Sequence, residues 1–91
     1  MSTVYDYLAI RRVANKVKSV STSVSNMASS DIKKLNNTMS GNFVGDAANA
    51  LSNELETLRS DLKNLSKGLS GVASDLYAFA ARIKAIDEAD S

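Results

Sequence analysis

The side chains of this sequence offer few groups that could catalyse a reaction. The chain has no histidine and no cysteine, so the commonest general base, the thiol nucleophile and zinc–thiolate ligands are absent. Carboxylates remain, but no pair of them falls at inward positions of the apolar stripe, where burial could shift a pKa. The second half also has no glutamate at a core position for a carboxylate metal site. We therefore predict a protein that is not an enzyme and has no cofactor or metal.

The C-terminal end carries acidic residues where a helix disfavours them. Asp87, Glu88 and Asp90 would lie at the negative end of the helix dipole. One interpretation is a frayed, solvated end. The other is that Ile83, one helical turn before Asp87, forms a pair with it on one helix face, and that a partner recognises this pair.

Charge and hydropathy exclude other classes of function. The net charge is +1, from 11 basic and 10 acidic residues, which gives no basic face for nucleic acid. No apolar run reaches the roughly 18 residues that span a bilayer, so we expect no stable membrane insertion. Residues 1–6 lack the basic and apolar regions of a signal peptide. Export would therefore need a signal-peptide-independent route.

Apolar residues recur in alternating steps of three and four from Ala48 to Ile86, and this is the period of a helix stripe. The same alternation runs from Ile10 to Met27. Such stripes need another helix to cover them. The predicted partner seam consists of Val13, Val17, Val20, Val24, Leu51, Leu55, Leu58, Leu62, Leu65, Leu69, Leu76 and Phe79.

We predict an all-α fold in a single domain spanning 1–91, with helix 1 at about 3–40, a turn at about 41–45 and helix 2 at about 46–87. The absence of proline allows such long helices. A short turn makes the two helices an antiparallel hairpin. A hairpin this small usually needs help to be stable, so we expect it to associate into a four-helix bundle with another copy or a different chain.

The stripe of helix 1 slips by about one residue after Met27, because the next apolar positions are Ile32 and Leu35. Either a local change of helical winding absorbs the slip, or helix 1 breaks and a new helix starts at Asp31.

The middle of the chain predicts the turn. Gly41 suits a left-handed position at the end of helix 1, and Phe43 would act as an aromatic plug. Gly45 would make the turn, because glycine tolerates a positive φ.

Together these features resemble the WXG family of small helical-hairpin proteins of type VII secretion. Phe43-Val44-Gly45 stands where that family has Trp-x-Gly at its turn, and Ile83 and Asp87 stand where it has a Tyr-x-x-x-Asp/Glu export motif. The sequence departs from the family at Phe43 and, more strongly, at Ile83. The resemblance covers essentially the whole chain.

The resemblance implies a type VII secretion substrate, either a secreted effector or a co-secreted partner or targeting factor for a larger toxin. Its partners would be a second hairpin, as a homodimer or a heterodimer, or the helical N-terminal domain of a toxin, together with the secretion ATPase. The protein would be found in the cytoplasm before export. A cytoplasmic chaperone or structural bundle protein would use the same seam. Binding to a membrane surface through an amphipathic helix is a third hypothesis, which the Ser-rich faces of mixed charge disfavour.

Overall fold

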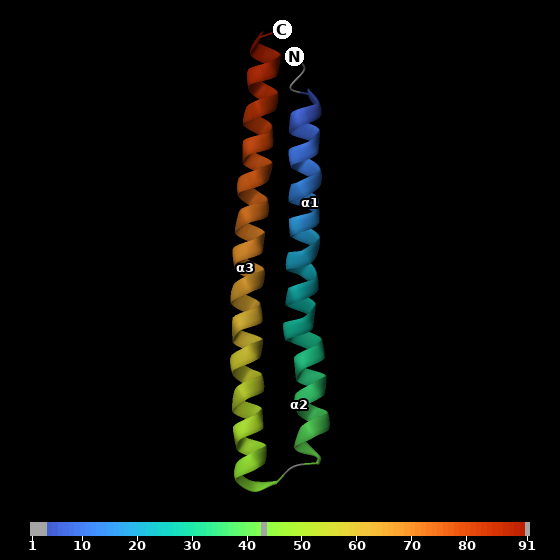
Figure 1. Ribbon diagram of the computed structural model, residues 1–91, viewed down its shortest axis with the longest axis vertical. Helices are drawn as coiled ribbons and strands as arrows, with labels where there is room; N and C mark the ends of the chain where they lie inside the picture. The colour runs from blue at the N-terminus through green and yellow to red at the C-terminus, as the bar shows by residue number, and fades with distance from the viewer. Residues whose placement is uncertain (1–3, 43, 91) are drawn as a thin grey trace.

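The structure is a computed structural model that describes residues 4–42 and 44–90, and almost all of them are helical. The order is α1 (Val4–Asn26), a π-helical turn η1 (Met27–Asp31), α2 (Ile32–Ser40) and α3 (Gly45–Asp90). No strand occurs within the described residues, so the predicted all-α class is confirmed. Figure 1 shows α3 lying beside α1, η1 and α2 in the opposite direction, so that the start of α1 lies beside the end of α3.

The molecule is a rod rather than a compact domain. It measures 69 × 15 × 14 Å, and its radius of gyration is 20.1 Å. A compact chain of this length would have a radius of gyration of about 12 Å. Since α3 alone is 46 residues long, one helix accounts for the whole length of the rod. Within the described residues no large side chain is fully buried.

Six small residues join the two sides of the rod. They recur every seventh position in each helix, and we call them the small-residue stripe: Ala14, Ser21 and Ala28 in α1 and η1, and Ser66, Ala73 and Ala80 in α3. The alanines are at most 1% exposed. Small side chains let two helix backbones approach closely, so this stripe is the line along which α1 and α3 pack.

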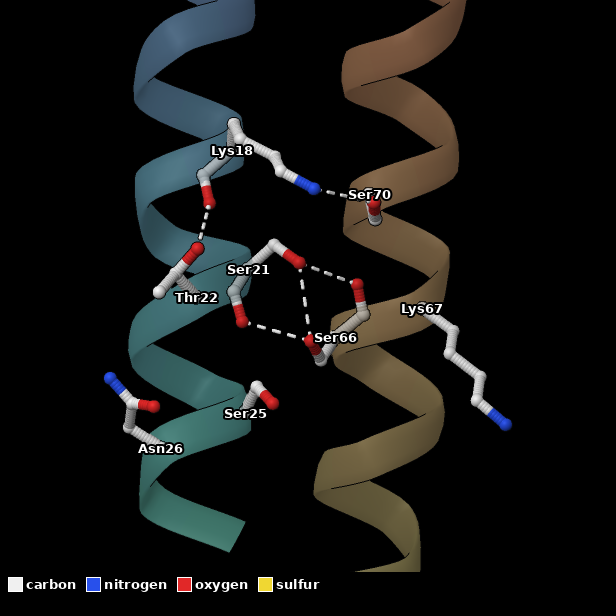
Figure 2. A pocket seen from close by; sticks show the side chains of 8 residues that line it. All are labelled: Lys18, Ser21, Thr22, Ser25, Asn26, Ser66, Lys67 and Ser70. Atoms are coloured by element: carbon white, nitrogen blue, oxygen red, sulfur yellow. Dashed lines mark hydrogen bonds between the residues drawn. The ribbon is translucent and has the colours of Figure 1, made fainter. Parts of the chain in front are cut away.

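Ser21 and Ser66 face each other at the middle of this stripe. The Ser21 hydroxyl donates to the Ser66 carbonyl oxygen at 2.7 Å, and the Ser66 hydroxyl donates to the Ser21 carbonyl oxygen at 2.8 Å (Figure 2). Continuing this antiparallel register by seven residues places Ala14 opposite Ala73. The reciprocal bonds satisfy two hydroxyls that the close packing would otherwise leave without partners.

The slip in the apolar stripe of helix 1 coincides with η1. The backbone N–H of Ile32 donates to the carbonyl oxygen of Met27, five residues earlier, instead of the usual four. The flanking residues Asn26 and Ile32 keep right-handed helical angles. The helix therefore does not break at Asp31. One wider turn takes up the extra residue and returns Ile32, which is buried, to the inner side.

Deleting Ser29 should therefore convert η1 into an ordinary α-helical turn without moving α2. Ser29 is exposed, and its removal would restore an unbroken seven-residue spacing from Val20 to Leu35. We expect the free energy of unfolding to stay within about 1 kcal/mol of the native value. Chemical denaturation followed by circular dichroism measures it. Deleting Ser19, which has no wide turn to absorb it, is the control and should unfold much of the pair; equal effects of both deletions would contradict this account of η1.

The end of α2 differs from the sequence prediction. Gly41 has φ −78° and ψ −14°, which is right-handed, so its predicted left-handed position was wrong. The reason is local hydrogen bonding: the Asn42 N–H donates to the Met39 carbonyl oxygen, and the Asn42 side-chain amide donates to the Thr38 carbonyl oxygen. These bonds cap the helix without a left-handed residue. The positive φ, 71°, occurs at Gly45, where α3 begins.

Candidate interaction surface

Many large apolar side chains of this rod are exposed to solvent. Nine of them lie in the helices, and each is 42–56% exposed. We call this set the apolar face: Val13, Val20, Met27, Leu35, Leu58, Leu65, Val72, Phe79 and Ile86. Scattered exposed hydrophobic residues are normal in soluble proteins, but a contiguous apolar patch marks a surface that binds something. The spacing here is regular, with a step of seven residues from Leu58 through to Ile86.

Both helices contribute to the same side of the rod. Val13 comes one residue before Ala14 of the small-residue stripe, and Leu65 comes one residue before Ser66. In two antiparallel right-handed helices, positions with the same offset from the contact line fall on one side of the pair. The apolar residues therefore form one continuous face along most of the 69 Å rod.

The predicted partner seam divides into three sets. Leu55 is buried. Exposed residues of the seam are Val13, Val20, Leu58, Leu65 and Phe79, and half-buried residues are Val17, Val24, Leu51, Leu62, Leu69 and Leu76. Apart from Leu51, which lies seven residues before Leu58, the half-buried residues occupy the other half of the three–four alternation, nearer to the opposite helix. These residues make the floor of the apolar face, and the residues in the half of the alternation that includes Val13, Val20, Leu58 and Leu65 make its two flanks.

The sequence prediction of the seam left out four residues of this face: Met27, Leu35, Val72 and Ile86. It also assumed that large apolar residues would make the contact between the two helices. The small-residue stripe makes that contact instead. The signal for it was present in the sequence, as alanine and serine recurring every seventh residue immediately after the large apolar residues.

The opposite side of the rod is polar. A shallow groove of about 280 Å³ lies there. Figure 2 shows the Ser, Thr and Asn side chains that line it, together with Lys18 and Lys67. The ammonium group of Lys18 donates to the Ser70 hydroxyl at 3.1 Å. Nearer the termini, Tyr77 donates a hydrogen bond to Asn15, and the Lys84 ammonium lies 5.5 Å from the ring centre of Tyr7. The two sides thus differ sharply in polarity.

The predicted recognition end is only partly covered. Ile83 and Asp87 are both half-buried and lie one turn apart on α3. Asp87 continues the line of Ala73 and Ala80, whereas Ile83 lies on the floor of the apolar face. Lys84 forms an ion pair with Glu88 at 3.9 Å, and the last turn of α3 holds no basic residue. Of the predicted turn motif, Gly45 is exposed, while Phe43 lies outside the described residues.

The accessible surface of the chain is large for its mass. It is 6421 Å² for 9.7 kDa. A compact folded protein of that mass exposes about 5,100 Å², so this chain exposes about 1,300 Å² more. Much of that excess comes from the elongated shape, which leaves the apolar face uncovered. The fold has more surface to bury than its two helices can bury by themselves.

Within residues 4–42 and 44–90, no helix is long and apolar enough to cross a membrane. The same residues hold no cluster of three or more acidic side chains that could bind a metal ion. Comparison with known proteins gave no match, whether with family models, curated proteins or solved structures.

Proposed function

We propose that the protein is a non-enzymatic helical hairpin that works by pairing its apolar face with a second helical hairpin, which completes a four-helix bundle. The apolar face is the observation that carries this proposal. A rod with one apolar and one polar side has one side to bury and one to keep in water. The partner covers the flanks and makes a core above the half-buried floor.

We further propose that this bundle belongs to type VII secretion. The protein is then either a secreted effector or a co-secreted partner and targeting factor for a larger toxin. Support comes from the resemblance at Phe43, Gly45, Ile83 and Asp87, and from the half-buried, adjacent placement of the last two on α3. Pairing would cover Ile83 on the floor of the apolar face, and Asp87, which continues the line of Ala73 and Ala80, would remain at the end of the rod to meet the secretion ATPase.

Replacing Asp87 with alanine should lower export while leaving the helices intact. Loss of one charge-assisted contact with the ATPase weakens binding by roughly tenfold or more. The measurement is the ratio of protein in the culture medium to protein in the cells, for this chain and its co-secreted partner. Asp75→Ala is the matched control, because Asp75 is an exposed acid on the same helix and far from the end. Equal export of both variants would rule out a role of Asp87 as a secretion signal.

A cytoplasmic chaperone or structural bundle protein is the second candidate. The observation that favours it is Ile83, which puts an aliphatic side chain where the resemblance requires tyrosine. Such a protein uses the same apolar face but stays in the cell. Its presence in culture medium, at a level above that of a cytoplasmic marker, would decide against this candidate.

A further inference from the structure

We propose that the rod has a separate binding site on its polar side, and that this site takes an aromatic ring that bears a phosphate group. The site is a cavity of about 320 Å³ between the start of α1 and the end of α3, lined by Tyr7, Arg11, Tyr77, Ala81 and Lys84. Cavities that bind small ligands start at about 300 Å³ and combine apolar walls with a few well-placed polar groups. The proposal does not depend on pairing of the apolar face.

The cavity lies on the side of the rod that pairing leaves open. Lys18 of α1 donates to Ser70 of α3 on the polar side (Figure 2). Arg11 precedes Lys18 by seven residues, and Tyr77 follows Ser70 by seven. Residues seven apart share a helix face, so Arg11 and Tyr77 lie on the polar side as well. Lys84 comes seven residues after Tyr77 and continues this line. A partner on the apolar face therefore does not cover the cavity.

Two cations line the cavity, and none of its described lining residues is acidic. Arg11 is exposed and makes no ion pair within the described residues. The Lys84 ammonium lies 5.5 Å from the ring centre of Tyr7, a cation–π contact that holds it beside the cavity. Its ion pair with Glu88 spans 3.9 Å between two side chains that are more than half exposed, so this pair opens at little cost.

The charge of the lining fits a phosphate ester. A phosphate monoester carries about −1.5 to −2 charges at pH 7, which Arg11 and Lys84 together balance. The guanidinium of arginine presents a planar set of donors that matches phosphate oxygens, and the lysine ammonium adds a second charge.

Tyr77 and Ala81 give the cavity a flat apolar wall. Tyr77 is half-buried, and its hydroxyl donates to the Asn15 side chain, which fixes the orientation of its ring. Ala81 follows one helical turn later, and its small methyl group leaves open the space that a larger side chain would fill. The ring of a ligand can stack on Tyr77 in that space. Inorganic phosphate would use only the cations of the cavity, and a neutral ring only its wall.

Titration with phenyl phosphate, followed by two-dimensional NMR of the isotope-labelled chain, tests this site. We expect saturable shifts that are largest at the five lining residues. Inorganic phosphate and phenol, the two halves of the probe, should each bind about tenfold more weakly, because each lacks one set of contacts. Inorganic phosphate that binds as tightly as phenyl phosphate overturns the inference. So does phenyl phosphate that shows no saturation, or that shifts mainly the residues of the apolar face.

Two pairs of variants locate the binding. Arg11→Gln should weaken binding of phenyl phosphate by about tenfold or more, because a charge-assisted contact is lost. Arg12→Gln is its matched control, since Arg12 is adjacent and exposed but does not line the cavity. Ala81→Leu fills the cavity and should weaken binding by a similar factor, whereas Ala85→Leu adds the same side chain at an exposed position outside it. Equal binding within either pair, with all four variants helical by circular dichroism, overturns the inference.

An aryl phosphate reaches such a site either as a small molecule or as a phosphorylated tyrosine of a peptide. A short peptide with one phosphotyrosine flanked by alanines distinguishes the two sources. Tighter binding of this peptide than of phenyl phosphate supports the site and identifies a protein side chain as its ligand. Equal or weaker binding of the peptide, with phenyl phosphate still bound, supports the site and identifies a small molecule.

Discussion

Replacing Leu65 with aspartate is expected to abolish association while leaving the single chain folded. The Leu65 side chain is 51% exposed in the isolated rod, so a carboxylate there can stay in water. In a bundle it would be buried against the partner without a counter-charge, which costs several kcal/mol. We expect at least about 100-fold weaker association, equivalent to about 2.7 kcal/mol. Analytical ultracentrifugation over a range of protein concentrations measures this change.

The control for this variant is Asn64→Asp. Asn64 is the neighbouring residue, it is exposed, and it lies on the side of α3 away from the apolar face, so the substitution adds the same charge without entering the interface. Its association should match that of the native chain. The native melting temperature should also rise with protein concentration, because a partner that binds only the folded state stabilises it. Unchanged association of Leu65→Asp would exclude the apolar face as the pairing surface.

Replacing Ala73 with leucine is expected to separate the two helices of the rod itself. Ala73 is 1% exposed, and the antiparallel register places it opposite Ala14, which is fully buried. A leucine has no room there, and overpacking of this kind costs typically about 1–3 kcal/mol. Its effect would spread to the Ser21–Ser66 hydrogen bonds, because the same backbone approach makes them possible. Urea denaturation at constant protein concentration measures the loss of free energy of unfolding.

Ala78→Leu provides the comparison for this second variant. It is the same substitution in the same helix, but Ala78 is exposed. Leucine and alanine differ little in helix propensity, so the change at position 78 should alter the free energy of unfolding by less than about 0.5 kcal/mol. Similar losses at both positions would mean that the small-residue stripe is not the line of contact.

The helical class and the long helices could be predicted from the sequence because they depend on local information. An unbroken three–four alternation and the absence of proline specify a helix without reference to any neighbour. The inner face of the helix was harder to predict. The alternation combines two series of apolar residues, each with a seven-residue spacing. Leu62 belongs to one series and Leu65 to the other. Only the small residue that follows, Ser66, decides that Leu62 turns partly inward and Leu65 outward.

Two further details depended on competing local interactions. The slip after Met27 was visible in the sequence, but a wide turn and a break give the same pattern of residues, and the Ile32–Met27 hydrogen bond distinguishes them. At the end of α2, glycine at position 41 suggested a left-handed cap. The hydrogen bonds from Asn42 make such a cap unnecessary, and the left-handed backbone conformation occurs at Gly45 instead.

The wide turn at η1 also bears on how this chain would align with a homologue that lacks it. It occupies one extra residue yet leaves the helix on either side in the same phase relative to α3. A homologue that lacks this residue would keep every contact on both sides. An alignment without a gap would then pair the wrong residues on one side of η1, and the similarity of the two sequences would be missed there. The gap belongs between Met27 and Asp31, and a search that permits it there compares like with like.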